Sequence, residues 1–221
     1  MRIFSSPKMN VLPDVNAARG LRPTLGGLGA VVLALTLAAC GASRPIKYHQ
    51  LTYPTTTPSS SAPINVTLMV RSFDAPPLLR EGAIVYCPRP EELGVYAQNR
   101  WIAPPVEMLQ SFLVRGLRSS GRFRSVILAR GEGGGDFALT GSLYDFEEVD
   151  GAEIVARLSY NVRLRDRRTG TMVWTHSYNY DEPASAKTVD AVVAAMDKNV
   201  QRSVLEVQTA LEQYFANHPA S

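Results

Sequence analysis

The sequence predicts an α+β fold: a mixed, largely antiparallel sheet with a mid-chain helix and a long C-terminal helix on one face. Three observations predict it. Apolar and polar residues alternate over 154–165, which is typical of a strand with one buried face. Apolar residues recur at helical spacing over 104–120 and 187–217. Strands precede and follow the first helix, an order typical of helices packed against a sheet.

The first 39 residues have the parts of an export signal. Four basic residues against one acid lie ahead of an apolar run at 25–39. The run is shorter than the roughly 20 apolar residues that cross a bilayer. It ends in Leu-Ala-Ala-Cys at 37–40, which resembles the lipobox of bacterial lipoproteins and implies that Cys40 is acylated, with chains such as palmitate, after cleavage at 39. An uncleaved anchor or a buried helix is the alternative.

The charge balance argues against a nucleic-acid partner. Four of the 23 basic residues and one of the 20 acidic residues lie in the first 39 positions, so the mature chain keeps 19 of each. A nucleic-acid surface requires clustered positive charge. Besides Cys40 there is only Cys87, so an intrachain disulfide framework is excluded once Cys40 is acylated. Cys87 is expected to be buried at a strand end.

Residues 40–63 are predicted to be the lipidated cysteine and a tether, because Pro, Ser and Thr dominate their second half. Within them, 46–53 is the one stretch that suits a short strand. The globular domain is expected over 64–217 as a single unit, followed by a tail at 218–221.

The first part of that domain alternates strands with breakers. Residues 64–71 alternate as a half-buried strand that Pro76-Pro77 ends. A short turn at 78–81 leads to a second strand at 83–87, and 91–103 is interpreted as a loop.

Pro104-Pro105 suit a helix start, where a missing N–H costs nothing, and Gly121 suits its end. A strand at 123–128 and a flexible Gly-rich loop at 131–135 follow.

Three long strands and a helix complete the chain. The strands are predicted at 137–149, 154–165 and 172–180, with an Asp150-Gly151 turn between the first two, and together they form an antiparallel meander. The helix at 187–217 would run about 45 Å. That length predicts that its end projects beyond the sheet or packs against a neighbouring subunit.

Candidate catalytic and metal-binding residues are few. His176 lies among aromatic residues on one strand face, where a core or interface histidine is the favoured interpretation over a ligand. The acids at 145–150 suit a solvated or calcium-attracting turn better than a carboxylate pair. We therefore expect no catalytic residue, no metal site and no cofactor, and we do not expect an enzyme.

A set of ordered motifs resembles the ABC-type transport auxiliary lipoprotein family, the PqiC-like lipoproteins. The motifs are Tyr-His-Gln-Leu at 48–51, Tyr-Ala at 96–97, Arg-Trp-Ile-Ala-Pro-Pro at 100–105, Gly-Arg-Phe at 121–123, and a looser match at 139–147. The resemblance implies a non-catalytic component of a lipid-transport system. Such a component works with an inner-membrane ABC permease and an MCE-domain protein that spans the periplasm.

The resemblance also implies a location at the outer membrane, and the residue types around the first helix indicate a contact surface. Gly41 after the acylated cysteine permits transfer to the outer membrane, with the domain facing the periplasm. Tyr96, Trp101, Pro104 and Pro105 are the predicted partner contacts, because aromatic side chains on rigid backbone make good anchors. The alternative for Trp101 is that it fills the core beneath the first helix.

Two other functions stay open at the level of sequence. One is a lipoprotein regulator of a cell-wall synthase, which requires a long tether. The other is a direct lipid-binding carrier, which requires an apolar cavity. The long helix is also compatible with a homo-oligomer.

Overall fold

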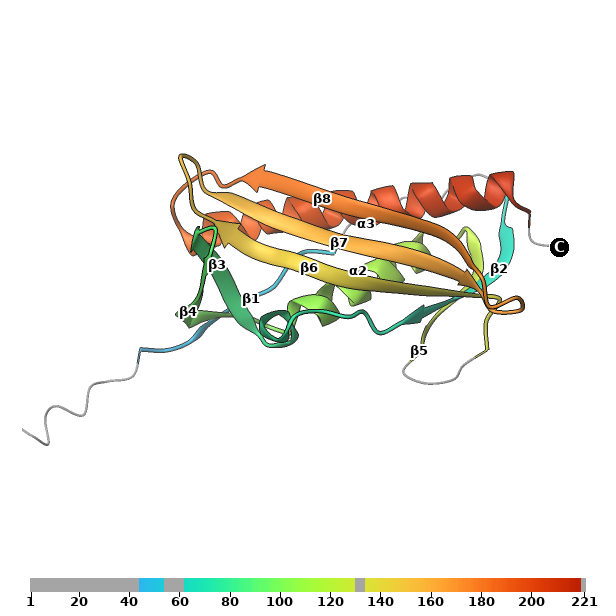
Figure 1. Ribbon diagram of the computed structural model, residues 1–221, viewed down its shortest axis with the longest axis horizontal. Helices are drawn as coiled ribbons and strands as arrows, with labels where there is room; N and C mark the ends of the chain where they lie inside the picture. Colours follow the sequence, from blue (N-terminus) through green and yellow to red (C-terminus); the bar gives the residue numbers. More distant parts are fainter. Residues whose placement is uncertain (1–43, 54–61, 130–133, 220–221) are drawn as a thin grey trace, which may run out of the picture. The chain divides into compact units, whose positions relative to one another are not determined.

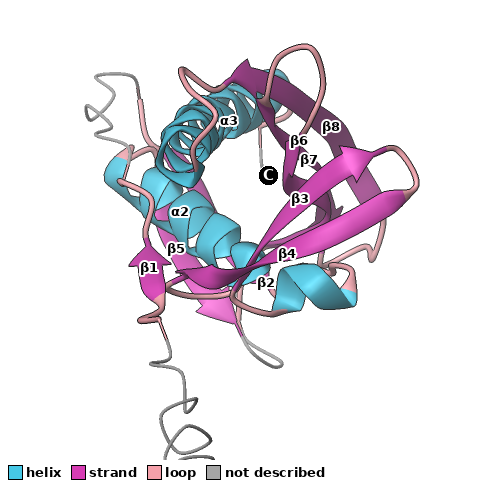
Figure 2. Ribbon diagram, turned by 90° about the vertical axis from the view of Figure 1, so that its left-hand side faces the viewer, coloured by secondary structure: helices cyan, strands magenta, loops and turns pink. Residues whose placement is uncertain are grey.

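An eight-stranded mixed sheet curves around two helices in the computed structural model, which describes residues 44–53, 62–129 and 134–219 (Figures 1 and 2). The chain divides into two units, 1–44 and 45–221, and the description below concerns the second. The predicted α+β class, with a mid-chain and a C-terminal helix, is confirmed.

The elements occur in the following order. The strands are β1 (Lys47–His49), β2 (Ile64–Arg71), β3 (Ala83–Arg89), β4 (Glu92–Trp101), β5 (Phe123–Ala129), β6 (Phe137–Val149), β7 (Val155–Asp166) and β8 (Met172–Pro183). The helices are a 3₁₀ turn η1 (Pro77–Arg80), α2 (Pro105–Ser119) and α3 (Val189–Asn217).

Strand β6 organises the sheet, because it pairs along both edges. One edge pairs antiparallel with β7, which pairs with β8, so the predicted meander is confirmed. The other edge pairs parallel with β2 near its start and with β3 near its end. A single bridge, Asp74 to Ser142, lies between them. Strands β2 and β3 therefore lie one after the other along the same edge of β6, and η1 lies in the segment that connects them.

A bulge in β6 explains why its sequence alternation fails. The pairing register with β7 shifts between Leu143 and Asp145. An extra residue in one strand moves all later side chains to the opposite face. In β7, which keeps its alternation, Ala156, Leu158 and Tyr160 are fully buried.

The prediction of a loop at 91–103 is wrong, because 92–101 forms β4. This strand pairs antiparallel with β3 and parallel with β1. Its pattern is hard to recognise because Leu93 and Val95 are 55% and 42% exposed and its register against β3 is irregular. Backbone pairing on two sides holds a strand in which Trp101 is the one fully buried side chain.

The bounds of both helices lie within two residues of the predicted ones. Pro105 begins α2, and Gly121 adopts a left-handed φ of 64° just after it, a conformation that glycine takes without strain. Helix α3 begins at the cap Thr188, whose hydroxyl accepts a hydrogen bond from the Ala191 amide at 3.3 Å.

The apolar stripe of α3 is covered within the chain, so neither a projecting end nor a neighbouring subunit is needed to bury it. Its buried residues extend from Val192 to Phe215. Strands β6 to β8 are 12 or 13 residues long and span about 40 Å, which matches the helix (Figure 1). The sheet is therefore long enough to cover α3 along most of its length.

Residues 47–53 belong to the fold, which confirms the short strand suggested for 46–53. Strand β1 pairs with β4. Leu51 is 5% exposed, and the Thr52 amide donates to Asp197 on α3 at 2.7 Å. The ring of Tyr53 stacks on Phe112 of α2 with centroids 4.5 Å apart. The folded domain thus begins well before residue 64.

Several predictions lie outside the described residues. These are the export signal at 1–39, acylation of Cys40, the Pro/Ser/Thr-rich stretch at 54–61 and most of the Gly-rich loop. Cys87, in contrast, is described: it is buried, as predicted, near the end of β3. Its thiol donates to the Arg89 carbonyl at 3.0 Å, and burial raises its pKa.

Candidate docking surface

The four residues predicted as a partner contact do not form one exposed surface. Trp101 is 3% exposed, and its ring meets Phe146 edge-on with centroids 5.4 Å apart. Pro105 is buried as the first residue of α2, and Pro104 and Tyr96 are partly exposed. The indole of Trp101 therefore fills the core, which was the alternative interpretation. Contact through Tyr96 and Pro104 stays a prediction.

Tyr96 has a structural partner in a buried carboxylate. Its hydroxyl donates to Glu148 Oε2 at 2.8 Å, and Glu148 is only 4% exposed. Burial, followed by the hydrogen bond to Glu148, raises the Tyr96 pKa well above its usual value, so the hydroxyl stays a donor. Burial likewise raises the pKa of Glu148, which the Tyr96 hydrogen bond partly offsets.

The acids of this hairpin do not converge on one site. Successive residues of β6 point to opposite faces, so Glu147 and Glu148 are separated by the sheet. Asp145 shares a face with Glu147 and accepts a hydrogen bond from Ser159 on β7, whereas Glu148 lies near Asp150, so the acids divide into two pairs. Among the described residues there is no group of three or more potential metal ligands.

The Glu148→Gln variant is expected to gain stability relative to the unmodified protein as pH rises above the ordinary glutamate pKa of about 4. A raised carboxyl pKa means that the folded state holds the proton more tightly, so its contribution is full at low pH and is lost as pH rises through the raised value. The difference amounts to about 1.4 kcal/mol for each pH unit between the folded and unfolded pKa values. Urea unfolding at several pH values measures it.

Glu153→Gln is the control, because Glu153 lies exposed in the adjoining loop. Unfolding curves for Glu148→Gln that keep a constant offset from the unmodified protein at every pH would show that Glu148 is not held at a raised pKa.

A more open surface is the free edge of β8. This strand pairs only with β7, so the backbone groups along its other edge have no strand partner in the described sheet. Four aromatic rings occupy one face of it: Trp174, His176, Tyr178 and Tyr180. Neighbouring ring centroids lie 6.1, 4.6 and 6.4 Å apart. An exposed edge of this kind is a template for another strand.

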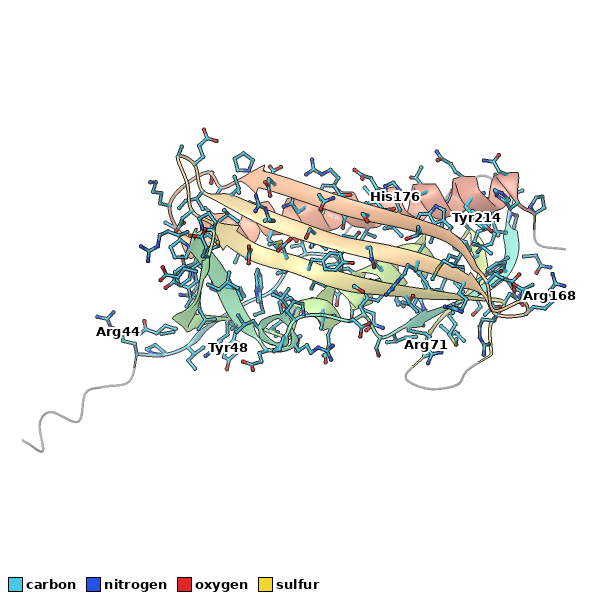
Figure 3. The ribbon with its side chains drawn as sticks, viewed as in Figure 1. Arg44, Tyr48, Arg71, Arg168, His176 and Tyr214 are labelled. Atoms are coloured by element: carbon cyan, nitrogen blue, oxygen red, sulfur yellow. The ribbon has the colours of Figure 1, made fainter. Side chains whose placement is uncertain are left out.

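Helix α3 forms the other wall of a groove beside this edge, with Leu205 as its large apolar residue. A groove of about 310 Å³, the β8–α3 groove, is lined by His176 and Tyr178 from the strand and by Leu205, Glu206 and Thr209 from the helix. Leu205 is 45% exposed. His176 is exposed here, beside α3, rather than in the core (Figure 3). A core position for this histidine is therefore wrong, because β8 is an edge strand and α3 covers only part of it, whereas an interface position stays a prediction.

Polar contacts fix one end of the groove. The Tyr180 hydroxyl donates to Glu206 Oε2 at 2.6 Å, and the Arg202 guanidinium lies 4.6 Å above the same ring. Burial and this hydrogen bond raise the Tyr180 pKa, so its proton is retained. The helix and the edge strand are thereby held at a fixed separation, which preorganises the groove.

Sequence reasoning missed the groove, although one signal for it exists. Leu205 lies outside the apolar stripe of α3, which contains Val200, Val204 and Val207. A large aliphatic residue off the stripe of an otherwise amphipathic helix is a candidate for contact with another molecule.

Comparison with known proteins places the fold. A family model described as ABC-type transport auxiliary lipoprotein component matches residues 49–208. No curated protein matches the chain. The crystal structure of protein XCC0632 from Xanthomonas campestris is similar, with a TM-score of 0.71 and 22% identity over 78% of this chain and 98% of that one. A second crystal structure, of an uncharacterized protein, has a TM-score of 0.58 and 16% identity, and covers 76% and 99% of the two chains.

Proposed function

Because the chain belongs to the family of ABC-type transport auxiliary lipoprotein components, we propose that it is the membrane-anchored, non-catalytic docking component of an ABC-type lipid-transport system. Its partner is an MCE-domain protein that spans the periplasm, and the β8–α3 groove receives that partner. The open β8 edge beside exposed Leu205 carries the proposal. An edge offers backbone hydrogen bonds to an added strand, and the adjoining groove offers apolar contact.

The anchor is part of the same proposal. Acylated Cys40 holds the domain at the outer membrane, since each buried CH₂ contributes about 0.8 kcal/mol and more than one chain gives durable attachment. Among the helices that the structure describes, none has the length and hydropathy to cross a bilayer. Intact mass of the membrane-extracted protein tests acylation, and separation of the two membranes tests the location.

Capture of the purified lipidated protein by the MCE-domain protein tests the docking surface. Leu205→Glu is expected to weaken the affinity by about tenfold or more, the size of effect typical when one central interface residue is lost. The cause is a charge placed in a groove that the partner must desolvate. Titration calorimetry or surface capture measures it.

Ala194→Glu is the matched control, since Ala194 is exposed on the same helix but does not line the groove. Equal affinity of the Leu205→Glu and unmodified proteins would refute docking in the groove. No capture of the unmodified protein would refute the MCE partner, and self-association lost in Leu205→Glu would assign the groove to a second copy instead.

Two observations weigh against the alternative functions. A cell-wall synthase regulator requires a long tether, but β1 begins at Lys47, only seven positions after Cys40, and is already paired with the sheet. A lipid carrier requires an apolar chamber. A pocket of about 650 Å³ is instead lined mostly by polar and charged side chains, among them Arg124, Asp136 and Arg167.

A further inference from the structure

The first strand leaves little free chain between the proposed anchor and the fold. Strand β1 is fixed by its pairing with β4 and by an ion pair of 2.6 Å between Lys47 and Asp190 on α3. Ile46 follows Cys40 by six positions, which span at most about 21 Å when fully extended. If Cys40 is acylated, the β1 end of the domain is therefore kept close to the bilayer.

Three of the exposed large apolar side chains lie on or directly beside β1. They are Ile46, Tyr48 and Ile102, at 49%, 64% and 61% exposure, and we call them the β1 patch. The Ile102 amide donates to the His49 carbonyl at 2.9 Å, which places Ile102 directly beside β1. Tyr48 is opposite Arg100 in the register of β1 and β4, so these two side chains share a face.

We infer that the β1 patch contacts the bilayer interface beside the lipid anchor. This inference rests on the acylation of Cys40 included in the proposed function. Ile46 and Ile102 suit the boundary between headgroups and acyl chains, and Tyr48 suits the headgroup level, where amphipathic rings collect. Arg100 adds positive charge that favours lipid phosphates.

A bilayer fits this patch better than a protein does. An acylated residue at most about 21 Å away already brings the bilayer to it. The opposite end of the domain, which carries the β7–β8 turn with Arg168, would then face away from the membrane (Figure 3).

A fluorescent label on single cysteines tests the contact in the full lipidated protein, with Cys87 replaced by alanine. An NBD label at Tyr48→Cys or Ile102→Cys is expected to lose most of its emission to headgroup-spin-labelled phospholipid in vesicles of phosphatidylethanolamine and phosphatidylglycerol. The same label at Met172→Cys is the control and should keep its emission. Met172 is 44% exposed and follows the β7–β8 turn at the far end.

The outcomes separate this inference from the proposal beneath it. Protein that floats with the vesicles while the labels at 48 and 102 stay unquenched would overturn the contact but leave the anchor intact. A label at 48 that is shielded from water yet unquenched by lipid would assign the patch to a protein partner and overturn the inference too. Protein that does not float, and that has an unmodified mass, would refute acylation and the inference with it.

Discussion

Replacing Gly116 by leucine is expected to lower the free energy of unfolding by about 2–3 kcal/mol, although leucine is the better helix former. Gly116 is buried where α2 crosses α3, and a Cβ there would lie 2.3 Å from Val204 Cγ1. Val204 is 1% exposed and β-branched, so it cannot rotate away within its helix. The overlap must separate the two helices, and this outweighs the gain of roughly 1 kcal/mol in helix propensity.

Ser111→Leu is the matched control, since it also replaces a weaker helix former by leucine, at an exposed position of α2. A double-mutant cycle sharpens the test. Gly116→Ala should cost less in a Val204→Ala background than alone, because the smaller partner makes room for the new methyl. Additive effects, or a stable Gly116→Leu protein, would contradict close packing of α2 on α3. Urea unfolding supplies all the free energies.

The parts of the fold that sequence predicted are those whose burial imposes a period. The stripe of α3 and the alternation at 154–165 were recognisable because each has one continuous apolar face, and β7 and α3 pack these faces together. Gly121 was identifiable because a left-handed residue after a helix favours glycine.

The parts that sequence did not predict depend on pairing rather than on side chains. Strand β4 is held between β1 and β3 by backbone hydrogen bonds, while its apolar residues Leu93 and Val95 are exposed, so its burial does not follow residue type. Trp101 was predicted as a contact because aromatic residues suit both cores and interfaces, and only the fold distinguishes these.

The docking surface could not be predicted either, because it too depends on strand pairing rather than on residue type. An edge strand is defined by the absence of a neighbour, which the residues of β8 cannot reveal, and its aromatic face is partly covered by α3. The groove exists because β8 is the last strand of the meander and α3 returns beside it.

Leu51→Ala is expected to lower the free energy of unfolding of the mature protein by about 2–4 kcal/mol. Leu51 is 5% exposed and packs in the main core, so removing its side chain leaves a cavity. Leu93→Ala is the control at a 55% exposed position, where the change should stay within about 0.5 kcal/mol. Urea unfolding compares the two.

This pair of variants decides where the fold begins. Composition assigned residues 40–63 to a tether, and in a tether a change from leucine to alanine at position 51 would leave stability unaltered. Docking of β1 predicts a large loss of stability, because Leu51 is then buried in the core. The neighbouring Thr52 amide, which donates to Asp197 on α3, holds this segment in place. An unfolding curve for Leu51→Ala that matches the unmodified protein would restore the long tether. The free chain after Cys40 would then be longer than the six positions to Ile46, and the acylated residue would no longer keep the β1 patch close to the bilayer.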